Sequence, residues 1–294
     1  MTSDSRSLVE AGAVLPFDRS GLRFDDGAEY RIEIATAEGA AVVHEIVAAA
    51  AEYGVPVRRV TQGSGGMLLM ESELRELVAT GRENDIEICV FVGPRGPWSG
   101  TASPHTPSGA VFGWRNFGFI ELSHALRDVE RMVDCGVRSV CVADEGLLRL
   151  IDEGRRNGDF PSDLRIKVSA LLGIANPIQA RILVENGADT LNVASDTSVQ
   201  RLAEFRATVD VPLDLYIESP DNLGGFARYW EVADIVAAAA PVHLKFALMN
   251  APNLYPSGVH LQGAAVLGAR ERVRRAKVAL EILDRLHESS SPSL

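Results

Sequence analysis

The sequence predicts a single-domain α/β protein that folds as a closed (β/α)8 barrel, the TIM-barrel architecture. From Tyr30 onward, short apolar segments typical of strands alternate with longer amphipathic segments typical of helices. The alternation occurs eight times, which is the number of units in a closed parallel barrel. No GxGxxG motif follows the first strand, which disfavours a dinucleotide-binding open sheet. A chain of 294 residues with 46% apolar content can bury such a core.

Turn signals separate the expected elements, because segments such as AEYGVP and ENGAD stop a helix and begin a strand within a few residues. The expected strands cover residues 31–37, 55–61, 87–92, 139–143, 165–171, 190–194, 212–218 and 242–248. The expected helices cover residues 38–54, 72–84, 120–135, 146–157, 177–186, 199–207, 225–240 and 267–287. We expect residues 1–28 to form an N-terminal extension that plugs the barrel, residues 29–287 the barrel domain, and residues 288–294 a disordered tail.

Composition limits the class of partner and the compartment. A net charge of −11 and the lack of a basic stripe disfavour nucleic-acid binding. No apolar run reaches membrane-spanning length, and the first residues do not read as a signal peptide. Cys89, Cys135 and Cys141 lack the spacing of a disulfide framework, a zinc site or an iron–sulfur cluster. The sequence therefore predicts a soluble cytoplasmic protein that acts on a small molecule.

The strand pattern predicts a charged barrel lumen. Because side chains alternate between the two faces of a strand, the apolar set packs under the helices and the other set points inward. The expected inward set is Arg31, Glu33, Ala35, Arg59, Glu87, Cys89, Phe91, Cys141, Lys167, Ser169, Asn192, Asp214, Tyr216, Glu218, His243 and Lys245.

Four of these residues are the catalytic candidates, namely Lys245, Glu218, Lys167 and Asp214. Buried charges cost several kcal/mol unless they pair or take part in chemistry, so a structural ion-pair network is the competing interpretation. Lys245 and Glu218 lie nearest the carboxyl ends of their strands, where barrel active sites lie, and we expect them to meet there. If a divalent metal binds, its candidate ligands are Glu33, Asp214 and Glu218; the cofactor is otherwise unknown.

Loops at the same end supply candidate substrate-binding residues. A glycine-rich turn after the second strand carries Gln62 and Ser64, and its backbone N–H groups suit a carboxylate or phosphate. The unusually long loop 93–118 carries Arg95 and predicts a mobile lid or, alternatively, a dimerisation arm of a homo-oligomer. The remaining candidates lie in the lumen or in the polar loop after the last strand: Asn192, Tyr216, Asn250, Asn253, Tyr255, Ser257 and His260.

Several segments resemble bacterial proteins of the U32 peptidase-like family. These are QGSGGMLL, VGPRG, VADEGLL, KVSALLGIANPIQARILVENGADTLNVASD, DLYIESPDNLGGF and KFALMNAPNLYPSG, within residues 30–274. The resemblance implies a barrel fold and, through the name of the family, peptidase activity. Relatives in RNA and ubiquinone hydroxylation hold iron–sulfur clusters through cysteines, but the three cysteines here lack such a grouping, so no cluster is expected.

Three functions follow as hypotheses. The first is a barrel enzyme acting on a small anionic metabolite by lyase, aldolase or isomerase chemistry. In this hypothesis the reaction passes through an enolate or imine intermediate, on which Lys245 and a carboxylate act. The second is metal-assisted hydrolysis of a peptide or amide, as the resemblance implies. The third is a binding or accessory barrel without catalytic activity.

Overall fold

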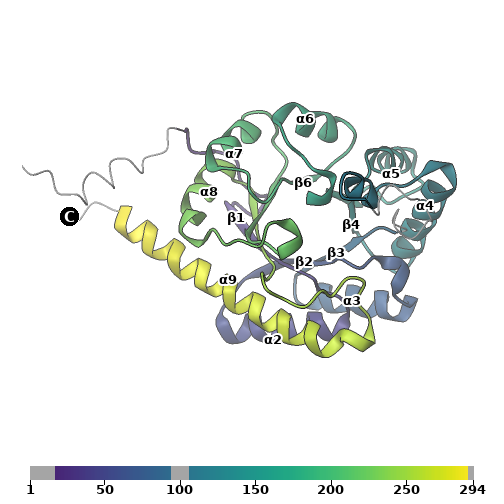
Figure 1. Ribbon diagram of the computed structural model, residues 1–294, viewed down its shortest axis with the longest axis horizontal. Helices are drawn as coiled ribbons and strands as arrows, with labels where there is room; N and C mark the ends of the chain where they lie inside the picture. Colours follow the sequence, from purple (N-terminus) through teal and green to yellow (C-terminus); the bar gives the residue numbers. More distant parts are fainter. Residues whose placement is uncertain (1–16, 94–105, 291–294) are drawn as a thin grey trace, which may run out of the picture.

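The strands pair in chain order and close on themselves. The computed structural model describes residues 17–93 and 106–290, and its eight parallel strands form a closed barrel in which β8 pairs with β1. The strands are β1 (Tyr30–Ala35), β2 (Val57–Gln62), β3 (Glu87–Phe91), β4 (Ser139–Val142), β5 (Arg165–Val168), β6 (Thr190–Asn192), β7 (Leu213–Glu218) and β8 (Val242–Phe246). The predicted (β/α)8 architecture is confirmed (Figure 1).

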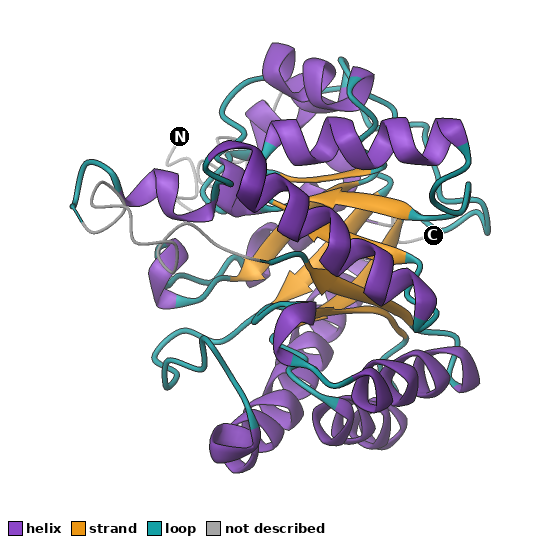
Figure 2. Cartoon of the chain, turned by 90° about the vertical axis from the view of Figure 1, so that its right-hand side faces the viewer, coloured by secondary structure: helices purple, strands orange, loops and turns teal. Residues whose placement is uncertain are grey.

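Helices surround the strands on the outside of the barrel (Figure 2). They are α2 (Ala40–Tyr53), α3 (Glu71–Glu83), α4 (Gly118–Asp134), α5 (Glu145–Asn157), α6 (Pro177–Glu185), α7 (Val199–Arg206), α8 (Val232–Ala239) and α9 (Gln262–Ser290). Among the described residues, none of these helices is both long and apolar enough to cross a bilayer.

The outward set of strand residues forms the main hydrophobic core with the helices. Ile32 and Ile34 of β1 are fully buried in one cluster with Val43 and Ile46 of α2. The same alternation repeats around the barrel, which leaves the polar set to fill the lumen. Local signals fix the helix ends. For example, Asp144 caps α5 by accepting a hydrogen bond from Leu147 N at 2.8 Å, as expected for a carboxyl group at this position.

The described part of the N-terminal extension lies under the amino end of the barrel. Ser20 N donates to Ala237 O at 2.8 Å, which attaches the extension to the end of α8. The buried Phe24 ring packs edge-on against the His243 ring, with centroids 5.0 Å apart. The Arg31 guanidinium lies over the Phe24 ring, 4.3 Å from its centroid. Phe24 thus covers the lumen from below.

Some expected boundaries are wrong. The fifth strand ends at Val168 and gives way to a 3-10 turn at Ala170–Leu172, because the Ser169 hydroxyl accepts from Leu171 N and bends the chain. Helix α9 begins at Gln262 and continues to Ser290, so residues 288–290 belong to the helix and not to a disordered tail.

Candidate active site at the carboxyl end of the barrel

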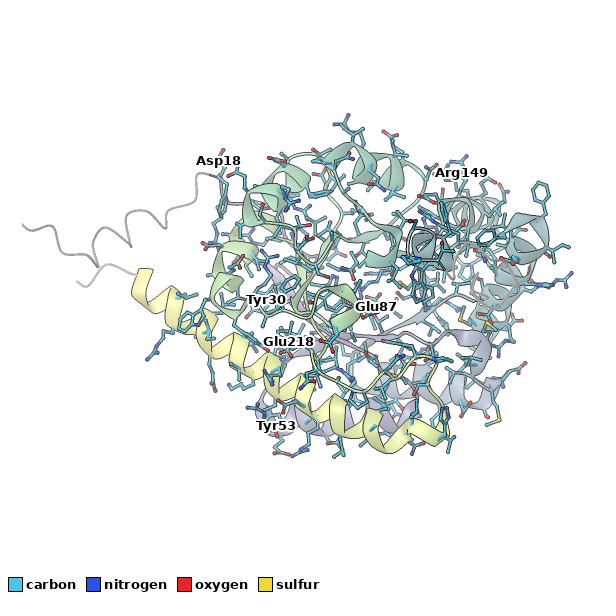
Figure 3. The ribbon with its side chains drawn as sticks, viewed as in Figure 1. Asp18, Tyr30, Tyr53, Glu87, Arg149 and Glu218 are labelled. Carbon is cyan, nitrogen blue, oxygen red and sulfur yellow. The ribbon has the colours of Figure 1, made fainter. Side chains whose placement is uncertain are left out.

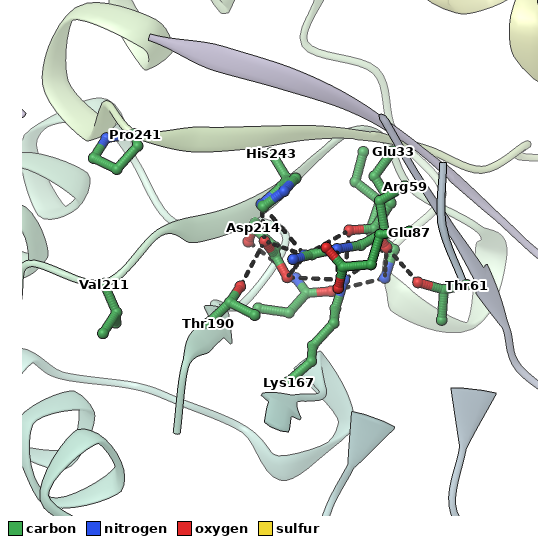
Figure 4. Close-up of polar contacts among 12 residues, drawn as sticks. Glu33, Arg59, Thr61, Glu87, Lys167, Thr190, Val211, Asp214, Pro241 and His243 are labelled. Carbon is green, nitrogen blue, oxygen red and sulfur yellow. Dashed lines mark hydrogen bonds and ion pairs between the residues drawn. The ribbon is translucent and has the colours of Figure 1, made fainter. Parts of the chain in front are cut away.

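A network of charged side chains fills the middle of the lumen (Figure 4). Lys167 Nζ donates to Glu33 Oε1 at 2.6 Å and lies 2.8 Å from Asp214 Oδ2. Arg59 Nη1 donates to Asp214 Oδ1 at 3.2 Å, and His243 Nδ1 lies 2.7 Å from the same oxygen. Arg59 Nε also lies 3.1 Å from Glu87 Oε1, although not in hydrogen-bond alignment. The structural ion-pair interpretation therefore describes the contacts of Lys167 and Asp214 well.

Electrostatics keep the two central carboxylates ionised. Burial alone raises the pKa of Glu33, but the Lys167 and Lys245 ammonium groups outweigh it and hold that pKa well below its usual range. The pKa of Asp214 is likewise depressed, because Lys167 and Arg59 outweigh its burial. Thr61 Oγ1 at 2.7 Å from Glu33 and Thr190 Oγ1 at 2.8 Å from Asp214 occupy further acceptor positions.

The metal candidates do not gather at one position. Glu33 and Asp214 share Lys167, whereas Glu218 has a separate set of partners. Within residues 17–93 and 106–290, no group of three or more His, Cys, Asp or Glu side chains is arranged to hold a metal ion. These three carboxylates are paired instead with lysine and arginine side chains of the protein.

Lys245 lies opposite Glu33 in the register of β8 and β1 and lines the cavity at the mouth of the barrel. Its Nζ donates to Asn192 Oδ1 at 2.9 Å, lies 3.2 Å from Glu33 Oε1, and sits 4.6 Å from the centre of the Tyr216 ring. Burial lowers the pKa of Lys245, but the Glu33 carboxylate together with Tyr216, Cys141 and Asp214 outweighs burial and raises that pKa well above its ordinary value. Lys245 is therefore a permanent ammonium at neutral pH.

Glu218 does not meet Lys245, contrary to expectation. The register between β7 and β8 shifts between Tyr216 and Glu218, so that Tyr216 pairs with Lys245 but Glu218 pairs with the outward-facing Phe246. A bulge of this kind inserts one residue and moves the following side chain to the other face. The fully buried Glu218 carboxylate instead accepts from the Tyr229 hydroxyl and from Met249 N, and lies 3.5 Å from Arg275 of α9. Figure 3 labels Glu218 among the side chains of the barrel.

A cavity of about 70 Å³ opens above Lys245 at the carboxyl ends of the strands. Such ends carry the active sites of barrel enzymes. A larger hollow of about 700 Å³ lies at the amino ends, but that face is not where barrel chemistry takes place. The lining of the mouth cavity includes Thr36, Thr61, Gly63, Trp114, Cys141, Ser169, Asn192, Tyr216, Asn222, Lys245 and Tyr255.

The glycine-rich loop after β2 binds a carboxylate that belongs to the protein. Glu38 accepts hydrogen bonds from Gly63 N at 2.9 Å, Ser64 N at 3.0 Å and Gln62 Nε2 at 3.3 Å. The loop has the expected anion-binding geometry, but its N–H groups are already used. Gln62 and Ser64 consequently shape the loop and are not placed to hold a ligand. Sequence reasoning missed Glu38, although it lies only three residues after the end of β1.

One residue of the loop after β8 enters the cavity. The Tyr255 hydroxyl lies 2.8 Å from Thr36 Oγ1, and its ring packs so closely on Gly63 that a Cβ there would lie 2.5 Å from it. Ser257 N donates to Ser64 Oγ at 2.7 Å, which joins the two loops. Asn250, Asn253 and His260 are exposed and do not line the cavity.

The long loop after β3 is described only in part. Arg95 lies outside the described residues. In the described part, Trp114 lines the mouth cavity, and Asn116 N donates to Asp144 Oδ2 at 3.1 Å. This portion therefore lies at the carboxyl end, next to the start of α5.

No protein-family model and no curated protein sequence matches the chain. Three solved structures illustrate what it is similar to. A protein named as a fructose-1,6-biphosphate aldolase, from Coccidioides immitis, is 10% identical with a TM-score of 0.50, and the match covers 88% of this chain and 94% of that one. A protein named as the copper homeostasis protein CutC, from Streptococcus agalactiae, is 9% identical with a TM-score of 0.50, over 73% and 98% of the two chains. A U32 peptidase is 16% identical with a TM-score of 0.41, over 70% and 74%. The two likenesses with a TM-score of 0.50 show, at these identities, the barrel fold alone.

Proposed function

We propose that the chain is a barrel enzyme that binds a small anionic metabolite in the mouth cavity and stabilises an enolate of it, as lyases, aldolases and isomerases do. The observation that carries the proposal is the Lys245 ammonium, which lines a small cavity at the carboxyl ends of the strands. Its partners in the lumen fix its position before any ligand enters.

A fixed cation in a small cavity supports this chemistry physically. A preorganised positive group stabilises negative charge that develops on an oxygen, and it does so more strongly where water is excluded. Because its pKa is raised, Lys245 favours the enolate route over the imine route, since imine formation needs the neutral amine. Asn192 and Tyr216 hold the ammonium from the sides and are inferred to orient it.

The neighbouring residues fit a small ligand. About 70 Å³ accommodates a molecule of a few heavy atoms, and Thr36, Ser169 and Tyr255 add hydroxyl groups around it. The described cysteines are free thiols, which suits the cytoplasmic location that we infer.

Deuterium exchange tests the proposal directly. The protein is incubated in D2O with a panel of small 2-oxo acids and carboxylates. NMR follows the loss of the signal from protons on the carbon next to the carbonyl group, which is C3 in a 2-oxo acid. We expect protein-dependent exchange for at least one compound, its loss in Lys245→Met, and its retention in Lys277→Met, which removes a lysine on α9. Exchange equal to the protein-free rate for the whole panel, or cleavage of a parallel peptide panel instead, contradicts the proposal.

A further inference from the structure

Two cysteines face the lumen on neighbouring strands and have no part in the function proposed above. On β3 Cys89 pairs with Ser139 of β4, and Cys141 of β4 pairs with Phe91 of β3, so the two cysteines are diagonal neighbours on one face. Each thiol shifts the pKa of the other. Both are buried in a small cluster that also includes Phe91 and Ala143.

The two thiols differ in what they can reach. Cys141 lines the mouth cavity, together with Lys245 and Asn192, whereas Cys89 is fully buried and lies outside the cavity lining. A molecule in the cavity therefore contacts one sulfur, and the second sulfur supports it from behind. The same cavity presents a thiol and a fixed ammonium to one small ligand.

We propose that Cys141 is a covalent ligand site that takes the carbonyl carbon of a small aldehyde acid or 2-oxo acid, with Cys89 as the group that positions its sulfur. In this step the bond between Cys141 Sγ and the carbonyl carbon forms as the carbonyl π bond breaks, and the carbonyl oxygen receives the proton that the thiol gives up. The product is a thiohemiacetal or thiohemiketal, and no oxidant is needed. The ligand carboxylate pairs with Lys245, so this part of the inference rests on the proposed function.

Electrostatics support this division of roles. The hydrogen bond from Cys89 lowers the pKa of Cys141 and, together with Lys167 and Lys245, outweighs the effect of burial. Burial raises the pKa of Cys89, so that this residue stays a thiol and can donate. A cysteine near cations and open to a cavity is the reactive kind, whereas a cysteine in an apolar layer is inert.

Alkylation of the intact protein tests the thiol. Iodoacetamide and iodoacetate are applied separately, and the labelled cysteine is identified by mass spectrometry; in each case the sulfur–carbon bond forms as iodide leaves. Cys135 is the internal control, because it is buried in the helix layer at the end of α4. We expect Cys141 to react about tenfold or more faster than Cys135 with iodoacetamide, and Cys89→Ala, which removes the donor, to slow Cys141. Equal rates for Cys141 and Cys135, or labelling of both only on unfolding, overturns the proposal.

Glyoxylate, the smallest aldehyde acid, tests the ligand class. We expect glyoxylate to protect Cys141 from iodoacetamide in the wild type and in Lys277→Met, but less in Lys245→Met. Protection that is equal in Lys245→Met contradicts the role of Lys245 while leaving the thiol site in place. Rapid alkylation of Cys141 without any protection by glyoxylate overturns the ligand class. Slow alkylation of Cys141 together with deuterium exchange that depends on Lys245 overturns the thiol site and leaves the proposed function standing.

Discussion

Lys245 Nζ lies 3.2 Å from Glu33 Oε1, across the join where the last strand of the barrel pairs with the first. Glu33 also accepts from Lys167, so one carboxylate connects a lysine at the mouth to a lysine in the centre. The two lysines therefore have different surroundings. Lys167 is fully enclosed between two carboxylates, whereas Lys245 faces the cavity on one side.

The first prediction compares these two lysines. Lys167→Met leaves Glu33 and Asp214 buried with fewer cations, and we expect it to lower the free energy of unfolding by about 3–5 kcal/mol. Lys245→Met leaves Glu33 paired with Lys167, so a smaller loss of about 1–3 kcal/mol is expected, together with weaker ligand binding. Urea denaturation of both variants measures the difference. A loss in Lys245→Met as large as that in Lys167→Met assigns both lysines to the scaffold.

The second prediction concerns Lys245 and Glu218. Because the bulge in β7 separates them, the stability losses of Lys245→Met and Glu218→Gln should add in the double variant to within about 0.5 kcal/mol. The loss from Glu218→Gln comes from its contacts with Tyr229, Met249 and Arg275, which join β7 to the turn before α8, to the loop after β8 and to α9. Recovery of stability in the double variant is incompatible with the observed register.

The sequence predicts the barrel well because its signal is repeated. Alternation of apolar and polar residues in each strand, as in β1 and β8, places Glu33, Lys167 and Asp214 inside the lumen, where the structure has them. The signal is local, so it survives small errors at the ends of elements.

The site is harder to predict, because it depends on events that periodicity does not encode. A single inserted residue in β7 turns Glu218 away from the lumen, and no residue type in DLYIES marks it. Glu38 and the N–H groups of Gly63 and Ser64 lie about 25 residues apart in sequence, and the pairing of β1 with β2 brings them together. The pairing of Cys89 with Cys141 likewise requires the register of β3 and β4.

The third prediction is a pH dependence due to His243. This side chain is buried against Phe24, Arg59 and Asp214, and its pKa is lowered because burial and Arg59 outweigh the attraction of Asp214. As pH falls below 6.5, the pKa of the histidine in the unfolded chain, the unfolded chain takes up a proton that the folded chain does not. The free energy of unfolding therefore decreases as the pH decreases.

We therefore expect wild-type stability to fall between pH 7 and 5.5 with a slope approaching about 1.4 kcal/mol per pH unit, relative to His243→Gln. The depressed pKa values of Glu33 and Asp214 add an acid-side loss below their unfolded values of 4.5 and 3.8, outside this window. The free energy of unfolding of both proteins is measured by urea denaturation across this pH range. If it changes with pH by the same amount in both, His243 is not held neutral.

The fourth prediction concerns backbone strain at Thr36, which lines the mouth cavity directly after β1. Thr36 has a φ of 61°, in the left-handed region that a β-branched residue avoids, and this conformation costs about 1–2 kcal/mol.

Thr36→Gly and Thr36→Val both remove the hydroxyl that contacts Tyr255, but only the glycine variant relieves the strain. We expect Thr36→Gly to be about 1–2 kcal/mol more stable than Thr36→Val, and Tyr255→Phe to lose about 1 kcal/mol through the same hydrogen bond. Thermal and urea unfolding of the three variants give the order. A valine variant as stable as the glycine variant means that Thr36 does not hold this conformation in solution, and the mouth cavity that it lines then has a different shape.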